Sequence, residues 1–312
     1  MNKLVLSIFL FLVVFSATAQ IEKANNFLSQ QSIDTIKTYE DTLSLLSFLI
    51  VNDSVEENRL LAVKKFIPTL VTALKEENSF HYPFEKLKSI SIQYPADSTF
   101  RIFTWQLYVD ENDYRYFGAI QMNTPELKLF PLRDRSHEVK DIKNDILPPD
   151  QWYGSVYYNL IDFDSNEGKK YLLFGYDGFS FHIKRKLIDV LSFKDNKPVF
   201  GAPVFVSVDP QFPHEPKNRI ILTFSAAASV KLNYDGHLEM IIFDHLISGS
   251  SEVPGQPPSN LPDGSYEGYQ LKNGQWEYVN KVFTHVYEKA PREEPSPFND
   301  GNREKDILGK EN

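Results

Sequence analysis

The chain has 312 residues, of which 42% are hydrophobic and 24% are charged, as in an ordinary globular protein. Acidic residues outnumber basic ones, and the net charge of −9 argues against nucleic acid or an anionic membrane surface as the partner. The chain has no cysteine, which excludes disulfides, thiol nucleophiles and a lipidated cysteine, so a stable fold must come from its core alone.

The first residues have the features of a secretory signal peptide. Lys3 supplies a positive charge, residues 4–15 are almost entirely apolar, and Ala17-Thr18-Ala19 fits the small-residue rule for cleavage. A membrane-spanning helix needs about 18 or more apolar residues, and this run is shorter. We therefore expect residues 1–19 to be removed. The mature protein would be periplasmic or extracellular, without a membrane span, and not a lipoprotein.

Residues 20–90 have the hydrophobic spacing of helices. A stripe recurs at intervals of three and four after the break at Asn52-Asp53-Ser54, and a second stripe precedes it, which predicts a helical hairpin. Ser54 and Glu57 have the spacing of a capping box at the start of the second helix. A short helix is also expected near residues 23–30. The hairpin is either a packing unit or a docking surface for another protein.

From residue 91 to 288 the hydrophobic period changes to two. Phe103, Trp105 and Leu107 would lie on one face of a strand, and the residues between them on the other face. Asp235-Gly236 and Asn273-Gly274 are strong hairpin dipeptides. The expected fold class is therefore α+β, with an N-terminal helical hairpin followed by a large antiparallel β meander. A sandwich, a barrel and a propeller-like arrangement would each protect the sheet edges. Residues 289–312 are polar and are expected to be a disordered tail.

Several short sequence segments of the β region resemble those of a family of exported proteins. They include Trp152-Tyr153-Gly154, Tyr176-Asp177-Gly178, and the runs at 186–193, 200–205 and 242–246. Residues 100–250 are similar to an uncharacterised family of exported proteins from Bacteroidota-type bacteria. The resemblance implies an exported location, and because the family has no assigned activity it implies no chemistry.

Common catalytic motifs are missing from the sequence. His214-Glu215 is not part of a zinc protease motif, because Asn218 stands where the second histidine belongs. There is no nucleophile elbow and no glycine-rich phosphate loop. The catalytic residues of any enzyme activity therefore stay unassigned.

Asp162, Asp164 and Asn166 are the candidate metal ligands. Oxygen side chains at alternate positions of a tight loop can converge on calcium, which takes six to eight oxygen ligands. The glycine that follows, Gly168, is one position late for an EF-hand, and no glutamate stands at the twelfth position. An Asx-rich turn explains the same residues through hydrogen bonds to the backbone. No other cofactor is expected.

A second polar set lies between residues 235 and 245. Along the strand expected from Leu238, His237 and Glu239 would share a face at positions i and i+2. Asp244 and His245 follow shortly after. A solvated outer face and a turn at Asp235 explain these residues equally well, because only convergent geometry would make them a site.

Tyr266, Tyr269 and Trp276 are the candidate binding residues. They lie beside loops and strand ends, and exposed aromatic rings can stack on sugars or anchor a protein interface. Filling of the core is the competing explanation, since a β domain must bury most of its aromatic rings.

Two functions follow from these observations. The first is an exported, non-catalytic binding or envelope-associated module, with an envelope protein, a secreted protein or a glycan as the partner. The alternative is an exported glycan-acting hydrolase that uses paired carboxylates, with Asp162 or Asp164 facing Glu239 or Asp244. Such an enzyme requires two carboxyl groups across a cleft at roughly 5 to 9.5 Å.

Overall fold

The computed structural model describes residues 27–249 and 259–283. The expected signal peptide, most of the expected short helix at 23–30 and the tail at 289–312 lie outside the described residues. The described residues up to Val282 belong to one compact unit. Within the described ranges, no helix has the length and apolar character needed to cross a membrane.

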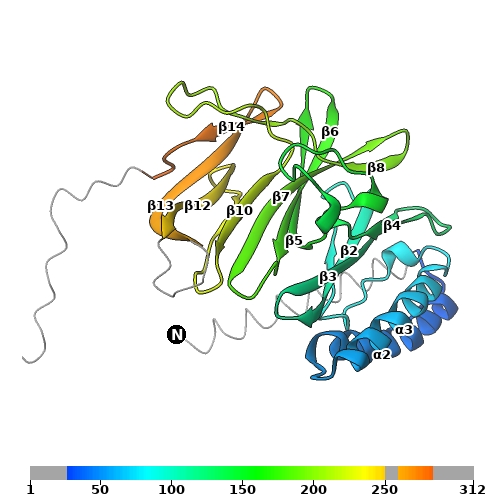
Figure 1. Ribbon diagram of the computed structural model, residues 1–312. Helices are drawn as coiled ribbons and strands as arrows, with labels where there is room; N and C mark the ends of the chain where they lie inside the picture. Colours follow the sequence, from blue (N-terminus) through cyan, green and yellow to red (C-terminus); the bar gives the residue numbers. More distant parts are fainter. Residues whose placement is uncertain (1–26, 250–258, 284–312) are drawn as a thin grey trace, which may run out of the picture. The chain divides into compact units, whose positions relative to one another are not determined.

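The predicted helical hairpin is confirmed. Helix α2 (Gln30–Asn52) begins at the N-cap Ser29, whose hydroxyl accepts the backbone N–H of Ser32 at 3.0 Å. Helix α3 (Glu56–Leu74) follows after a short turn and lies beside α2 (Figure 1). Their facing stripes are buried together, which is why these two amphipathic segments fold as a pair.

The predicted capping box at Ser54 and Glu57 is wrong. The N-cap residue of α3 is Val55, which makes no side-chain cap hydrogen bond. Asp53 organises the turn instead, because its Oδ1 atom accepts the backbone N–H of Val55 at 2.8 Å. The Asp53 carboxylate also accepts the amide of Asn58. An Asx turn thus competes successfully with the capping box for the free donors at the start of the helix.

Three sheets make up the predicted β region. The first sheet has the order β1-β2-β3-β4, with β1 (Ser91–Gln93), β2 (Phe100–Asp110), β3 (Asp113–Met122) and β4 (Leu129–Arg133). The second has the order β10-β7-β6-β5, with β8 beside β7; these strands are β5 (Val156–Ser165), β6 (Gly168–Asp177), β7 (Ile183–Lys194), β8 (Lys197–Phe200) and β10 (Ile220–Ser225).

The third sheet has the order β11-β12-β13-β14-β9. It consists of β9 (Phe205–Val206), β11 (Leu232–Asp235), β12 (Met240–Gly249), β13 (Ser259–Lys272) and β14 (Gln275–Val279). Among the described strands every pairing is antiparallel except that of β14 with β9. Hairpins connect the strands at both expected places. Asn273 and Gly274 have the positive φ of the expected turn, 49° and 74°, whereas in the longer connection after Asp235 the positive φ belongs to Glu239 and not to Gly236.

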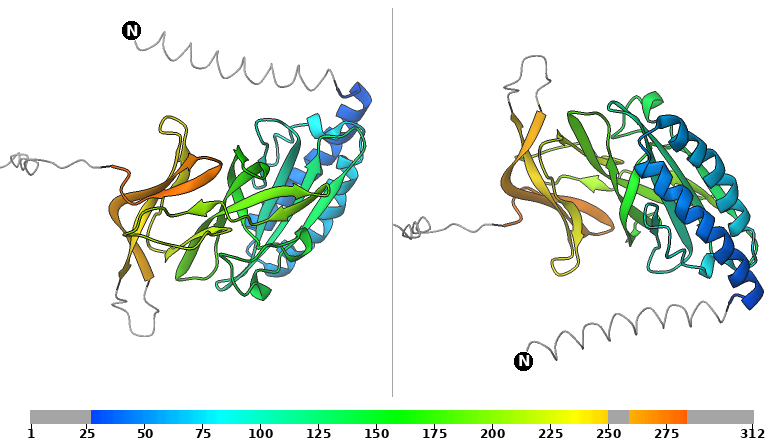
Figure 2. Two further views of the ribbon diagram at one scale, coloured as in Figure 1. Left: turned by 90° about the horizontal axis from the view of Figure 1, so that it is seen from above. Right: turned by 90° about the horizontal axis from the view of Figure 1, so that it is seen from below.

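The helix pair and the three sheets form four layers with three hydrophobic cores between them (Figure 2). In β2, Phe103, Trp105 and Leu107 face the helices, whereas Phe100 and Ile102 face the second sheet. The opposite face of the second sheet packs on the third sheet. The described strands therefore stack as open sheets and close no barrel.

Candidate functional site

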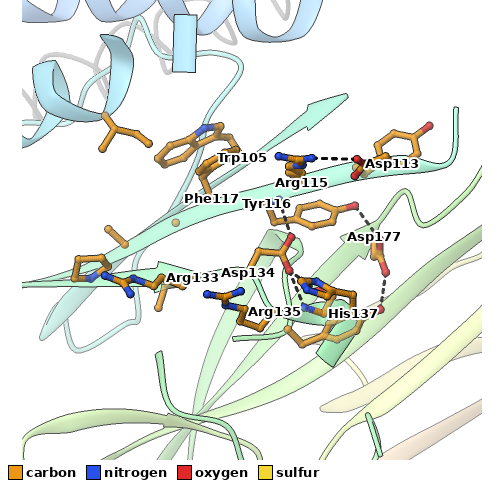
Figure 3. A pocket seen from close by; sticks show the side chains of 18 of the residues that line it. Trp105, Asp113, Arg115, Tyr116, Phe117, Arg133, Asp134, Arg135, His137 and Asp177 are labelled. Atoms are coloured by element: carbon orange, nitrogen blue, oxygen red, sulfur yellow. Dashed lines mark hydrogen bonds and ion pairs between the residues drawn. The ribbon is translucent and has the colours of Figure 1, made fainter. Parts of the chain in front are cut away.

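A groove of about 890 Å³ lies between helix α3 and the outer half of the first sheet. Its size is within the range of roughly 300–1,000 Å³ that is usual for small-molecule sites. Both helices pack against β2, in the middle of the sheet, so that β3 and β4 form the floor of the groove. The lining continues around the end of β4 to Tyr153, in the segment before the second sheet, and to Asp177 and Arg185 of that sheet. Figure 3 shows Asp177 at this end of the groove.

One part of the groove is apolar. Its wall on α3 consists of residues spaced three and four apart, namely Ile67, Leu70, Val71 and Leu74. On the floor, Trp105 stacks on Phe117 with ring centroids 5.8 Å apart. The floor continues through Ala119, Leu129 and Pro131. Ile67 is 37% exposed, so solvent reaches the apolar wall.

The other end of the groove is rich in arginine. Arg115 pairs with Asp113 at 3.4 Å, and Arg135 pairs with Glu138 at 3.0 Å. Arg133 is the last residue of β4, and it has no hydrogen-bond or ion-pair partner in residues 27–249 and 259–283. Phe117 is its cross-strand partner, so Arg133 shares the face of the apolar floor (Figure 3).

A buried network holds the back wall of this polar end. The Asp177 carboxylate accepts the hydroxyls of Tyr116 at 2.9 Å and Tyr153 at 2.6 Å. It also accepts the backbone N–H of Phe179 at 2.8 Å. The Tyr153 hydroxyl in turn accepts from Arg185 at 2.9 Å, and the Arg185 guanidinium lies 3.4 Å from the ring centroid of Phe179.

Burial is the main cause of the shifted pKa values in this network. Burial raises the pKa of the Asp177 carboxyl, although hydrogen bonds from Tyr153, Phe179 and Tyr116 oppose that rise. Burial, and then the charge of Asp177, also raise the pKa of both tyrosine hydroxyls. Both tyrosines therefore stay protonated and remain hydrogen-bond donors. The network supports the wall of the groove, and neither tyrosine is available as a tyrosinate base.

Asp134 anchors the loop that follows β4. Its Oδ2 atom accepts the backbone N–H of Tyr116 at 3.0 Å, and its Oδ1 atom accepts both the hydroxyl and the N–H of Ser136. The Ser136 hydroxyl accepts the backbone N–H of Gly154 at 2.8 Å. A Cβ atom on Gly154 would lie 2.6 Å from the Asp134 carboxylate, so the absence of a side chain permits this close approach.

Comparison with family models, with curated proteins and with solved structures finds no match to this chain. The chemistry of the groove therefore has to be inferred from its own residues.

The structure does not form the expected aromatic binding edge. Tyr269 and Trp276 are 3% and 2% exposed and belong to the core between the second and third sheets, so the prediction of an exposed edge is wrong for both rings. Tyr266 is half-buried, with the Lys231 ammonium 5.7 Å from its ring centroid. Strand alternation places Tyr269 and Trp276 on the face that the second sheet covers.

The three candidate calcium ligands lie on the β5–β6 hairpin. Asp162 is paired with Lys169 at 3.2 Å, and Lys169 also contacts Asp97 at 3.0 Å. Asp164 and Asn166 are exposed on the same hairpin. In the described part of the chain, no group of three His, Asp or Glu side chains is arranged to hold a metal. Calcium binding here stays a prediction, and it would require Lys169 to leave Asp162.

The polar set at 235–245 is dispersed. His237 and Glu239 lie in the turn before β12, and Glu239 has a positive φ of 50°, so the shared strand face expected for them is not formed. Asp244 is buried and its carboxylate accepts the backbone N–H of Lys231. His245 contacts Asp263 at 2.8 Å. Glu239 and Asp162 nevertheless line the same second pocket, which has a volume of about 300 Å³.

The groove residues were missed because no local spacing connects them. They come from α3, β2, β3, β4, the loop after β4, the segment before β5 and both sides of the β6–β7 hairpin. One sequence signal was available. The segments Tyr153-Gly154 and Asp177-Gly178 carry part of the family resemblance. They lie together at the back wall of the groove.

Proposed function

We propose that this protein is an exported, non-catalytic binding module that holds a ligand in the groove between α3, β3 and β4. The observation that carries the proposal is the rigid polar end beside an apolar floor. Export is supported by the signal-like residues 1–19 and by the resemblance to exported proteins of Bacteroidota-type bacteria.

The groove is built in advance of its ligand. Asp177 holds Tyr116 and Tyr153, and Tyr153 holds Arg185, so the back wall does not have to be ordered when a ligand binds. Preorganisation of this kind raises affinity, because the conformational entropy of the side chains is already lost in the free protein.

The polar groups of the groove suit binding better than turnover. The Ser136 hydroxyl donates to Asp134 and accepts from Gly154, and no histidine of the described residues is bonded to it. His137 is an exposed residue that contacts Glu138 at 3.4 Å. A nucleophile and its base should lie within hydrogen-bond reach, and the described groove residues do not provide such a pair.

Single-cysteine labelling tests the proposal cleanly, because the chain has no cysteine of its own. Ile67→Cys places a thiol in the groove. Leu61→Cys is the matched control, since it lies on the same helix, is 52% exposed and does not line the groove. A solvent extract of the cell envelope should slow maleimide labelling at position 67 and leave position 61 unchanged. Equal labelling rates with and without the extract at both positions would contradict the proposal.

A glycan hydrolase is the second candidate, and one observation favours it. Asp162 and Glu239 line the same small pocket, together with Tyr234, Gln270 and Trp276. Lys169 neutralises Asp162, which is unfavourable for an acid and base pair. Hydrolysis of envelope glycans by the wild type, abolished by Glu239→Gln and by Asp162→Asn, would establish this activity in place of simple binding.

A further inference from the structure

Arg133 is the cation that distinguishes the groove. Arg115 and Arg135 each have an acidic partner, and Arg185 is engaged by Tyr153 and Phe179. Arg133 is the one arginine of the groove for which the described residues supply no partner. A guanidinium presents a planar fork that matches a carboxylate with two parallel hydrogen bonds. The groove thus offers one guanidinium that no described residue engages.

The single unengaged guanidinium indicates a singly charged ligand. Four arginines and three aspartates, Asp113, Asp134 and Asp177, line the groove, and Arg135 is paired with Glu138 outside the lining. A monoanion would pair with Arg133. A dianion would bring a second negative charge near the aspartates, for which the lining offers no further unengaged guanidinium among the described residues.

The apolar floor leads directly to this charge. Along β4 from Leu129 to Arg133 the strand rises by about 3.4 Å per residue, which gives a floor about 14 Å long. Pro131 lies in the middle of it. Because proline has no backbone N–H, it blunts this edge strand against the addition of another strand. An extended peptide that pairs through its backbone is therefore a poor occupant.

We propose that the groove binds a single-chain acyl carboxylate, a fatty-acid anion of medium length. This inference rests on the proposed binding function. The carboxylate lies on Arg133, and the chain runs over Pro131 and Leu129 against the wall of α3. Transfer of each methylene from water to this surface is favourable, so affinity grows with chain length.

The test uses decanoate as the probe and isothermal titration calorimetry of the full mature protein. Decanoate should bind at least tenfold more tightly than hexanoate, and acetate should not bind. Arg133→Gln should weaken decanoate binding about tenfold and leave the binding of the uncharged analogue decanol unchanged. Lys128→Gln is the matched control, because it removes the same charge one residue before β4 from a side chain that does not line the groove. It should bind decanoate like the wild type.

The outcomes separate the ligand class from the binding function. Equal affinity of Arg133→Gln and wild type for decanoate overturns the role of Arg133. Tighter binding of decyl phosphate than of decanoate overturns the carboxylate assignment. If decanoate does not bind while the envelope extract still slows labelling of the Ile67→Cys variant, the ligand class is wrong and the binding function stands. If neither decanoate nor the extract protects the thiol of that variant, both proposals fail.

Discussion

Breaking the buried ion pair between β7 and the residue just before β10 should be strongly destabilising. Asp189 and Arg219 are both 0% exposed, with Nη2 2.9 Å from Oδ1, and Arg219 also donates to the carbonyl of Ile142. Arg219→Met leaves a buried carboxylate without its counter-charge. The expected loss in the free energy of unfolding is about 3–5 kcal/mol.

Proton uptake should relieve part of that loss. Burial already raises the pKa of Asp189, and removal of Arg219 raises it further, so the deficit of Arg219→Met should be smaller at acid pH than at neutral pH. Urea unfolding followed by tryptophan fluorescence measures both effects. Arg135→Met is the control for an exposed pair, and it should cost less than about 1 kcal/mol.

The double variant decides whether the two charges act as a pair. Replacing both residues, Asp189→Leu with Arg219→Met, removes the unpaired charge and should be less destabilising than either single change. A double variant that loses the sum of the two single losses would refute the reasoning, because the side chains would then contribute independently.

Three further predictions concern the hairpin and the groove. Asp53→Ala should lower the free energy of unfolding by about 0.5–1 kcal/mol, while Ser54→Ala changes it little in the same urea titration. Gly154→Ala should lower it by about 1–3 kcal/mol, because its Cβ would overlap its neighbours; Gly236, with open space around it, is the control for the same substitution. The raised pKa of Asp177 means that its contribution to stability is complete below the unfolded value and is lost as pH rises through the folded value. The deficit of Asp177→Asn should therefore shrink as pH rises, and a deficit that grows would contradict the raised pKa.

The start of α3 and the faces of the strands show how much a local sequence pattern can predict. Asp53 and Ser54 both suit a helix start, and only the folded turn shows that Asp53 takes the free N–H. Strand alternation correctly separates the two faces of β2. Alternation does not reveal whether the outward face of a strand meets water or another sheet. For that reason the sequence leaves both an exposed edge and the core open for Tyr269 and Trp276, and only the structure places them in the core.

The sequence by itself determined the secondary structure: a helical hairpin with period 3.6, then strands with period 2 joined by turns such as Asn273-Gly274. These features depend on near neighbours along the chain. Tertiary structure alone decided that the sheets stack and that α3, β4 and Asp177 enclose one groove around Arg133. Packing joins residues more than a hundred positions apart, and the free energy that brings them together comes from burial of whole faces, which no local spacing records.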